Sequence, residues 1–139
     1  MDFRNKEIKR GLKYSLQEKV VQEKTAQYLG SGSLEVYATP AMACLVEKAA
    51  VQAVASFLAE GWTTVGISLE LKHTSATPVG LMVKAEVEVL AVEGRRITFA
   101  FSVFDEAGEI GSGIHERFAV HEEKFRQKAA LKSAGKQVS

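Results

Sequence analysis

A glutamate and a histidine lie where the hydrophobic pattern of this sequence points inward. Glu47 falls in the apolar run 41–58, about 160° around a helix from the polar stripe that contains Lys48. His73 extends the alternating apolar series Val65–Leu71 by one further step of two residues. An inward carboxylate is costly unless it is paired, and a carboxylate beside an imidazole orients that ring to act as a general base. The two residues therefore predict acid–base chemistry.

Both residues also have a structural interpretation. If the helix is rotated slightly, Glu47 reaches solvent or a structural arginine, since glutamate is rarely fully buried. A lone inward histidine is usually a satisfied structural residue. The catalytic interpretation of His73 gains weight because Glu47 lies on the one helix that is expected to cover the same face of the strand.

Thr39 is the third candidate because it begins that helix. As the N-cap, its hydroxyl would accept a hydrogen bond from the backbone N–H of Ala41 or Met42. A helix N-terminus also presents free donors and the positive end of the dipole, which suit an oxyanion or a polarised carbonyl. Thr39 and Glu47 are separated by eight residues, roughly 12 Å along the axis, so they cannot touch. A histidine from the sheet or from a partner subunit would have to bridge the gap.

A change of hydrophobic period divides the chain into one long helix and several strands. Thr39, Pro40 and Gly61 mark the helix ends, because threonine caps helices, proline fits the first turn and glycine follows the last. Polar residues at every fourth position from Lys48 to Glu60 define the solvent face of the helix. The predicted elements are a strand at 12–21, the helix at 39–60, strands at about 65–73, 81–89, 97–103 and 109–121, and a charged helix at 122–132.

The strands after the long helix are joined by short turns at 93–95 and 106–108, which predicts an antiparallel sheet with one apolar face. Only the long helix is apolar enough to cover that face. We therefore expect an α+β fold of the hot-dog type, in which a curved antiparallel sheet wraps a long central helix. A cystatin-like or other α+β roll has the same order of elements. Residues 1–139 are expected to form a single domain, frayed at about 1–10 and 133–139.

The composition argues against two classes of binding partner, nucleic acids and membranes. The 18 basic and 17 acidic residues leave a formal charge of +1, which provides no field for nucleic acid or anionic lipid. The N-terminus lacks an apolar signal region, and charged residues interrupt the apolar run 41–58. We expect a soluble, cytoplasmic protein that binds a small molecule or another subunit, with no membrane and no nucleic acid.

Metal and thiol chemistry are not indicated. Cys44 is the only cysteine, so it cannot form an internal disulfide, and its apolar helical neighbours predict an inert core thiol. The three histidines have no short metal-ligand spacing, and Gly108, Gly111 and Gly113 lie in a strand and turn, not before a helix as in a phosphate loop. No metal site is predicted.

Several runs of residues, in one order, carry a resemblance to a known family. Over about residues 36–128 the sequence resembles the fluoroacetyl-CoA thioesterase and its relatives in the hot-dog superfamily. The spacings of eight residues from Thr39 to Glu47 and twenty-six from Glu47 to His73 are similar to those of the family's Thr, Glu and His. The matching runs are VYATPAM, GISLELKHTSATPVG, VEGRR, EIGSGIHER and EKF.

The resemblance implies an acyl-CoA thioester hydrolase that works as a homodimer or larger assembly. Two sheets would join edge to edge, with active sites and a pantetheine channel at the interface. Thr39 would attack the thioester or hold the attacking water, His73 would be the base and later the acid, and Glu47 would orient His73 or act on the water. Gly66 would offer a backbone N–H to the substrate carbonyl. Arg117 would contact a CoA phosphate or form a structural salt bridge. Coenzyme A is part of the substrate, and no separate cofactor is expected.

One segment departs from the family pattern. The fluoroacetyl enzyme has a longer segment before its VFAT-like run, with phenylalanines that cover the acyl group, whereas residues 28–33 here contain no phenylalanine. Discrimination against a close analogue needs a site built around the distinguishing group, so we expect a more general acyl-CoA thioesterase. The alternatives are a hot-dog hydratase or dehydratase, whose Asp/His motif we do not find, a non-catalytic acyl-CoA or small-ligand binding module, and a dimeric scaffold.

Overall fold

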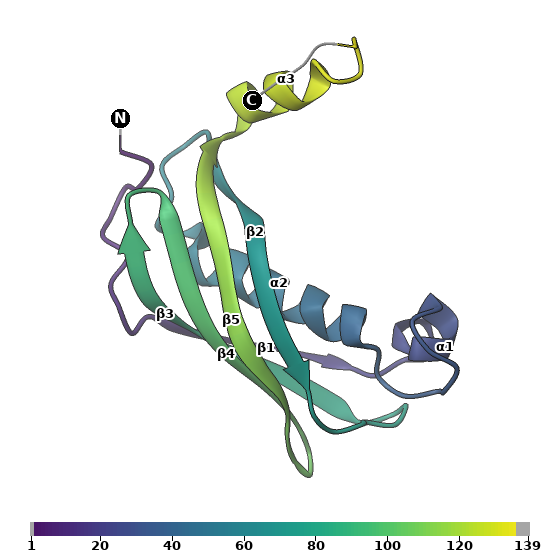
Figure 1. Ribbon diagram of the computed structural model, residues 1–139. Helices are drawn as coiled ribbons and strands as arrows, with labels where there is room; N and C mark the ends of the chain where they lie inside the picture. Colours follow the sequence, from purple (N-terminus) through teal and green to yellow (C-terminus); the bar gives the residue numbers. More distant parts are fainter. Residues whose placement is uncertain (1, 136–139) are drawn as a thin grey trace.

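The computed structural model describes residues 2–135 and contains one antiparallel sheet with a long helix on one face (Figure 1). The strand order is β1-β3-β4-β5-β2, so β1 and β2 form the two edges. The strands are β1 Lys13–Lys19, β2 Trp62–His73, β3 Met82–Glu93, β4 Arg96–Asp105 and β5 Gly108–His121. The helices are the 3₁₀ helix η1 Gln22–Lys24 and the α-helices α1 Ala26–Leu29, α2 Thr39–Ala55 and α3 Glu122–Ala130.

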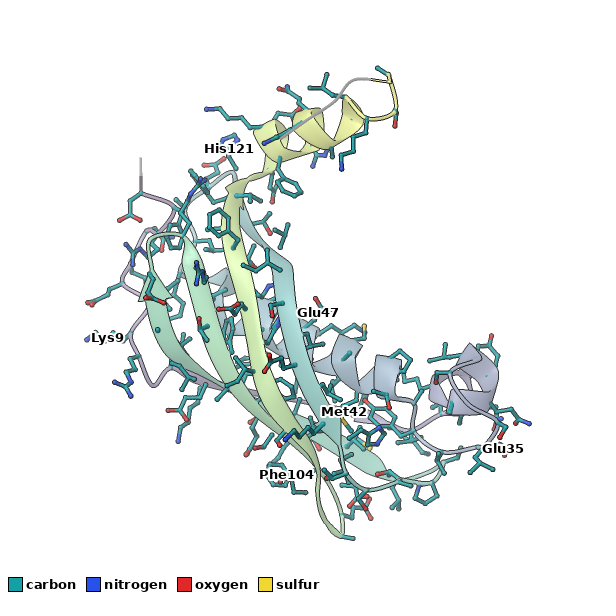
Figure 2. All side chains as sticks on the ribbon, viewed as in Figure 1. Lys9, Glu35, Met42, Glu47, Phe104 and His121 are labelled. Carbon is teal, nitrogen blue, oxygen red and sulfur yellow. The ribbon has the colours of Figure 1, made fainter. Side chains whose placement is uncertain are left out.

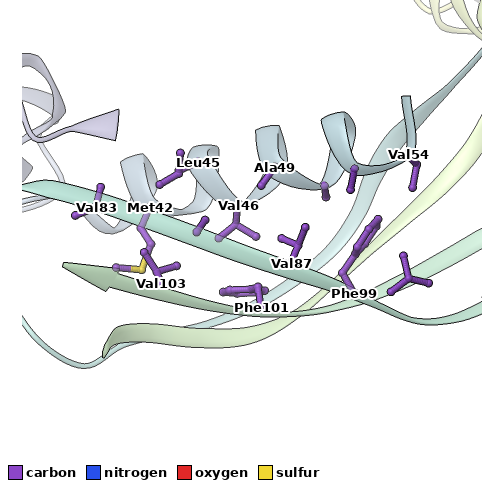
Figure 3. Packing of buried hydrophobic residues seen from close by; sticks show 14 of the residues in the cluster. Met42, Leu45, Val46, Ala49, Val54, Val83, Val87, Phe99, Phe101 and Val103 are labelled. Carbon is purple, nitrogen blue, oxygen red and sulfur yellow. The ribbon is translucent and has the colours of Figure 1, made fainter. Parts of the chain in front are cut away.

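The core lies between α2 and the inward faces of β3 and β4 (Figure 3). Both strands alternate buried and partly exposed residues, as the period of two predicts. Each large apolar side chain that is fully buried contributes roughly 1.5–3 kcal/mol relative to its exposed state. Packing against α2 therefore fixes the helix over the sheet. The contacting residues include Met42, Leu45, Val46, Ala49 and Val54 of α2, Val83 and Val87 of β3, and Phe99, Phe101 and Val103 of β4.

α2 begins at Thr39 as predicted but ends at Ala55, five residues earlier than expected. Residues after it are paired with the N-terminal segment instead, because the N–H of Asn5 donates to the Phe57 carbonyl and that of Ala59 to the Phe3 carbonyl. Gly61 has a left-handed φ of 85° in the turn before β2, so it does not terminate the helix.

The N-terminal segment is packed on the fold. Phe3 and Ile8 are only 3% and 4% exposed, so the prediction that residues 1–10 are frayed is wrong for the described part of this segment. The burial of two large apolar side chains holds it in place. Most of the second predicted frayed segment, 136–139, lies outside the described residues.

The predicted solvent face of α2 is correct near the middle of the helix, but the prediction included too few residues. Lys48 and Gln52 are exposed as predicted, whereas Ser56 and Glu60 lie beyond the helix. Cys44 lies four residues before Lys48, and it is exposed on the same face. The interpretation of Cys44 as a core thiol is therefore wrong, because apolar neighbours in sequence do not place a residue on the buried face.

A β-bulge between Gly66 and Ser68 interrupts the pairing of β2 with β5. On its C-terminal side Leu69, Leu71 and His73 face the helix layer, as predicted, whereas on its N-terminal side the inward residues are Thr64 and Gly66. The prediction that Val65 and Ile67 point inward is wrong, since the inserted residue reverses the alternation. Ile67 itself is 52% exposed.

The other predicted elements are present. β1, the β3–β4 hairpin that pairs Glu93 with Arg96, the β4–β5 hairpin and α3 all fall within a few residues of their predicted positions. α3 projects from the end of β5, away from α2 (Figure 1). Within residues 2–135 no helix is both long and apolar enough to cross a membrane.

Gly113 on β5 should be irreplaceable for stability. A Cβ there would lie 1.8 Å from the Glu70 carbonyl oxygen and 2.8 Å from the Phe101 ring, so backbone would have to move. We expect Gly113→Ala to lower the free energy of unfolding by about 3 kcal/mol in urea denaturation. Gly32→Ala is the control, because a Cβ at this exposed position would meet only the Ala26 Cβ, at 3.3 Å, and it should cost about 1 kcal/mol or less. Equal losses in the two variants would contradict the prediction.

Candidate active site

Thr39 and His73 form a hydrogen-bonded pair. Thr39 Oγ1 lies 2.8 Å from His73 Nδ1. The N-cap of α2 is Ala38, and no side chain caps the helix, so the predicted capping role of the Thr39 hydroxyl is wrong. Because Thr39 occupies the first helical position, its hydroxyl is turned toward the end of β2. A hydroxyl at this distance from an imidazole can pass its proton to the ring.

Backbone pairing holds the two residues together. The segment that precedes Thr39 is joined to the loop that follows His73, because the N–H of Tyr37 donates to the Thr77 carbonyl at 2.8 Å. Thr77 is fully buried, and its hydroxyl donates to Asp105 Oδ2 at 2.7 Å. Hydrogen bonds thus connect the loop after His73 both to the segment that begins α2 and to the β4–β5 hairpin.

The surroundings of His73 favour its neutral form. Burial lowers the pKa of His73, and a backbone hydrogen bond at Ser75 opposes this shift only in part. The second ring nitrogen, Nε2, is buried and has no hydrogen-bond partner among the described residues. A neutral imidazole with one nitrogen on a hydroxyl is the form that a general base requires.

Glu47 lies on α2, farther along the helix than Met42 (Figure 2), and its side chain meets Arg117 instead of His73. Arg117 Nη1 is 3.3 Å from Glu47 Oε2, and the Glu47 side chain is 45% exposed. The alternative interpretation, in which Glu47 reaches a structural arginine, is the one that the structure shows. One carboxylate oxygen is thereby paired with a cation, and the side chain remains accessible.

Arg117 is held from several sides. Its Nε donates to Thr64 Oγ1 at 2.9 Å and its Nη2 to the Thr64 carbonyl at 3.0 Å. Nη1 lies 3.2 Å from His115 Nε2, in addition to Glu47. Burial lowers the pKa of Arg117, and the charge of Glu47 acts in the opposite direction. Arg117 is only 5% exposed, so this geometry favours the predicted salt bridge over the contact with a CoA phosphate.

His115 is the second histidine of the region and is 1% exposed. Its Nδ1 lies 2.8 Å from the Ser68 carbonyl at the bulge. Because a carbonyl only accepts, Nδ1 carries the proton, and Nε2 is left to accept from Arg117. Burial lowers the pKa of His115; the Ser68 hydrogen bond raises it, the Arg117 charge lowers it further, and Glu47 and Glu116 raise it. The ring is therefore a neutral acceptor that fixes the guanidinium.

Gly66 allows the carboxylate to rest against β2. A Cβ at this position would lie 2.6 Å from Glu47 Oε2 and 3.2 Å from Arg117 Nη1. The absence of a side chain thus creates the space that Glu47 occupies. The predicted role of the Gly66 backbone as an oxyanion donor remains a prediction, and it would apply next to Glu47.

The predicted residues therefore form two groups in one chain. Thr39 is paired with His73, and Glu47 is grouped with Gly66 and Arg117. Six residues of β2 lie between Gly66 and His73, roughly 23 Å of strand. Among the described residues no hydrogen bond joins Glu47 to His73, so the expected pairing of the two does not occur within the chain.

Thr64, Ser68 and His115 are the residues that the sequence reasoning missed. His115 was considered only as a metal ligand, although it alternates with Arg117 along a predicted strand and so shares its face. That spacing could have identified the pair. Between residues 2 and 135 there is no group of three or more His, Cys, Asp or Glu side chains that could hold a metal ion.

A long helix packed on a curved antiparallel sheet defines the class of hot-dog-fold proteins. A hot-dog-like protein from Thermanaerovibrio acidaminovorans, 24% identical, has the same fold, with a TM-score of 0.82 over 88% of this chain and 91% of its own. A solved fluoroacetyl-CoA thioesterase is 37% identical and superposes with a TM-score of 0.87 over 91% of this chain and 98% of its own.

The family assignment follows from the sequence comparisons. The family model described as fluoroacetyl-CoA-specific thioesterase matches residues 20–123. The fluoroacetyl-CoA thioesterase of Streptantibioticus cattleyicolor is 44% identical over 99 residues, which is 71% of each chain. The chain belongs to this family. The predicted hot-dog fold and the predicted class of enzyme, an acyl-CoA thioester hydrolase, are confirmed at this level.

The buried neutral state of His115 predicts a loss of stability in acid. Because its pKa is lower in the folded chain than the value of about 6.5 expected when unfolded, the unfolded chain binds more protons just below that pH. The free energy of unfolding should therefore fall as the pH drops from about 7.5 to 5.5.

His115→Gln tests this origin, because an amide can still donate to Ser68 and accept from Arg117 but does not titrate. Urea denaturation at several pH values should give a shallower decline for this variant than for the wild type. His73→Gln is the comparison, since the pKa of His73 is lowered in the same direction. An unchanged slope in His115→Gln would contradict the assigned neutral state.

Proposed function

We propose that the protein hydrolyses small acyl-CoA thioesters, with Thr39, Glu47 and His73 as the catalytic residues of a site between two copies of the chain. The observation that carries the proposal is the 2.8 Å contact between Thr39 Oγ1 and His73 Nδ1 at the start of α2. Solved relatives have been obtained in complex with fluoroacetate and CoA and with acetyl-CoA, which supports a CoA thioester as the substrate class.

The pair supplies the proton transfers that thioester hydrolysis needs. His73 accepts a proton from the Thr39 hydroxyl, or from a water molecule held by that hydroxyl, as the oxygen bonds to the thioester carbonyl. The N–H groups in the first turn of α2 and the helix dipole stabilise the negative charge that develops on the carbonyl oxygen. When the carbon–sulfur bond breaks, His73 returns the proton to the CoA thiolate. If Thr39 itself attacks, water then hydrolyses the acyl-threonine ester in the same way.

A second copy of the chain can supply the carboxylate that His73 lacks. β2 is an edge strand, so its outer backbone groups are open to another strand. Antiparallel pairing with the partner's β2 reverses its direction and brings the Gly66 region of one chain toward the His73 end of the other. The partner's Glu47 would then orient His73 or act on the water. The exposed Ile67 on this edge and the exposed Val51 on α2 support burial against another chain.

The acyl group should be a small one without strong fluorine selectivity. Residues 26–36 form the short helix α1 and an exposed loop, in which Leu34 is 67% exposed and no phenylalanine is present. We expect the kcat/KM values for acetyl-CoA and fluoroacetyl-CoA to differ by less than about tenfold, measured by thiol release. A far larger preference for the fluorinated ester would contradict this specificity.

Replacement of the catalytic residues should abolish turnover and spare the fold. His73→Ala, Glu47→Gln and Thr39→Ala should each lower kcat for acetyl-CoA by about 10²–10⁴. Each change removes a group that donates or accepts the transferred proton, or one that orients the His73 imidazole or acts on the water. Thr39→Ser keeps the hydroxyl and should retain more activity than Thr39→Ala. Glu60→Gln, an exposed carboxylate beyond α2, is the matched control. Wild-type rates in all variants, or recovery of intact esters from the wild type, would reject the proposed hydrolysis.

Mixed dimers test whether the site is shared between chains. A dimer of one His73→Ala chain and one Glu47→Gln chain would contain one intact site if Glu47 comes from the partner, and none if both residues act within one chain. Co-expression with two different tags should therefore restore about a quarter of the wild-type activity in an unsorted mixture, since half of the dimers are mixed. No recovery of activity in purified mixed dimers would place Glu47 and His73 in the same chain.

A further inference from the structure

A second concave region lies at the other end of β2, between α3 and the sheet. It is a groove with a volume of about 720 Å³, within the range of small-molecule sites. His121, where β5 passes into α3, lies at its corner (Figure 2). Its wall combines aromatic rings with cations, and no aspartate or glutamate is among the described residues that line it. The rings include those of Trp62, Phe118 and Phe125, and the cations include Arg95, Lys124 and Lys128.

The cationic side chains of the groove have no acidic partners in the part of the chain that the structure describes, and one of them, Arg95, packs against the aromatic rings. The Arg95 guanidinium carbon lies 5.0 Å from the centroid of Phe118 and 5.9 Å from that of Trp62. Lys124 and Lys128 are one helical turn apart and so share one face of α3. None of these three cations forms a salt bridge within residues 2–135. For a chain whose formal charge is only +1, this is a strong local concentration of positive charge beside apolar walls.

This combination selects a flat aromatic ligand that carries several negative charges. Ring faces offer stacking and cation–π contacts to a heteroaromatic base, and arginine and lysine recognise phosphate. An uncharged acyl chain would not use the cations, and an inorganic anion would not use the rings. Under the proposed function, the substrate itself contains such a group, because coenzyme A ends in an adenosine 3′-phosphate 5′-diphosphate.

We propose that this groove binds the phosphorylated adenosine end of the acyl-CoA substrate. The inference rests on the proposed function for the identity of the ligand. Trp62 and His73 are the first and last residues of β2, a 12-residue strand that spans roughly 36 Å, which is longer than the pantetheine arm of CoA. A groove therefore cannot serve the Thr39–His73 pair of its own chain. In the antiparallel β2 pairing proposed above, Gly66 of one chain approaches the His73 end of the other, and Trp62 would lie four residues beyond Gly66, roughly 13 Å along the strand. The groove of one chain would then be within reach of a substrate held at the Thr39–His73 pair of the other.

The groove contains the only tryptophan of the chain, so binding can be followed directly. Titration of the intact protein with adenosine 3′,5′-bisphosphate should change the fluorescence of Trp62 and saturate. The Lys124→Ala/Lys128→Ala variant should weaken this binding at least tenfold, and the alanines preserve the α3 helix. Lys9→Ala/Lys19→Ala, two exposed lysines outside the groove, is the control with the same change of charge and should bind like the wild type.

Kinetics with a truncated substrate give a second readout. The ratio of kcat/KM for acetyl-CoA to that for S-acetylpantetheine should fall about tenfold in the Lys124→Ala/Lys128→Ala variant, because only the full substrate reaches the groove. An unchanged ratio together with unchanged nucleotide binding would overturn the proposal. So would dissociation of the dimer by this variant in sedimentation, since the groove would then be a protein contact.

The binding assay separates this proposal from the proposed function. If no CoA ester is hydrolysed but adenosine 3′,5′-bisphosphate binds in a manner that depends on Lys124 and Lys128, the catalytic proposal fails and the groove stands. If acetyl-CoA is hydrolysed and groove variants bind the bisphosphate as the wild type does, the groove proposal fails and the catalytic one stands.

Discussion

The burial of one face of α2 against β3 and β4 fixes the position of every other part of the site. Met42 and Val46, both fully buried, hold the first turns of the helix over the sheet. The start of the helix is therefore set with little freedom, and the Thr39 hydroxyl is directed at the last residue of β2. A hydrogen bond between one helix and one strand end is only as well aligned as the packing behind it, so the Thr39–His73 pair depends on the core.

The buried group under β2 follows a different principle. Arg117 and His115 are almost fully buried, and a buried cation is tolerated only when its donors are satisfied. Thr64, His115 and Glu47 together meet this condition. Glu47 is the only half-exposed member, and it is therefore the one that can contact another molecule. The network therefore holds one accessible carboxylate, that of Glu47, in a fixed position.

The sequence predicted the features that depend on local pattern. The alternating periods of β3 and β4, the turn between them and the start of α2 are each encoded within a few residues, and they were predicted correctly. The early end of α2 depends on Phe3 and Asn5, more than fifty residues away, and the bulge at Ile67 leaves no local signature. The Glu47–Arg117 contact likewise required the register of β5 against β2. The hydrophobic pattern located Glu47 and His73, and only the tertiary structure showed that each has a different partner.

The extra residue at Ile67 has a consequence for how this strand can change. Even-numbered residues face the helix before it and odd-numbered residues after it, so the two halves of β2 are kept in phase by a single insertion. Loss of one residue between Val65 and Ser68 would leave both halves as strands but turn one of them over. Either Gly66 would no longer lie against the Glu47 carboxylate, or His73 would no longer face the Thr39 hydroxyl. β2 therefore cannot lose a single residue in this segment, even at positions where the type of side chain can vary.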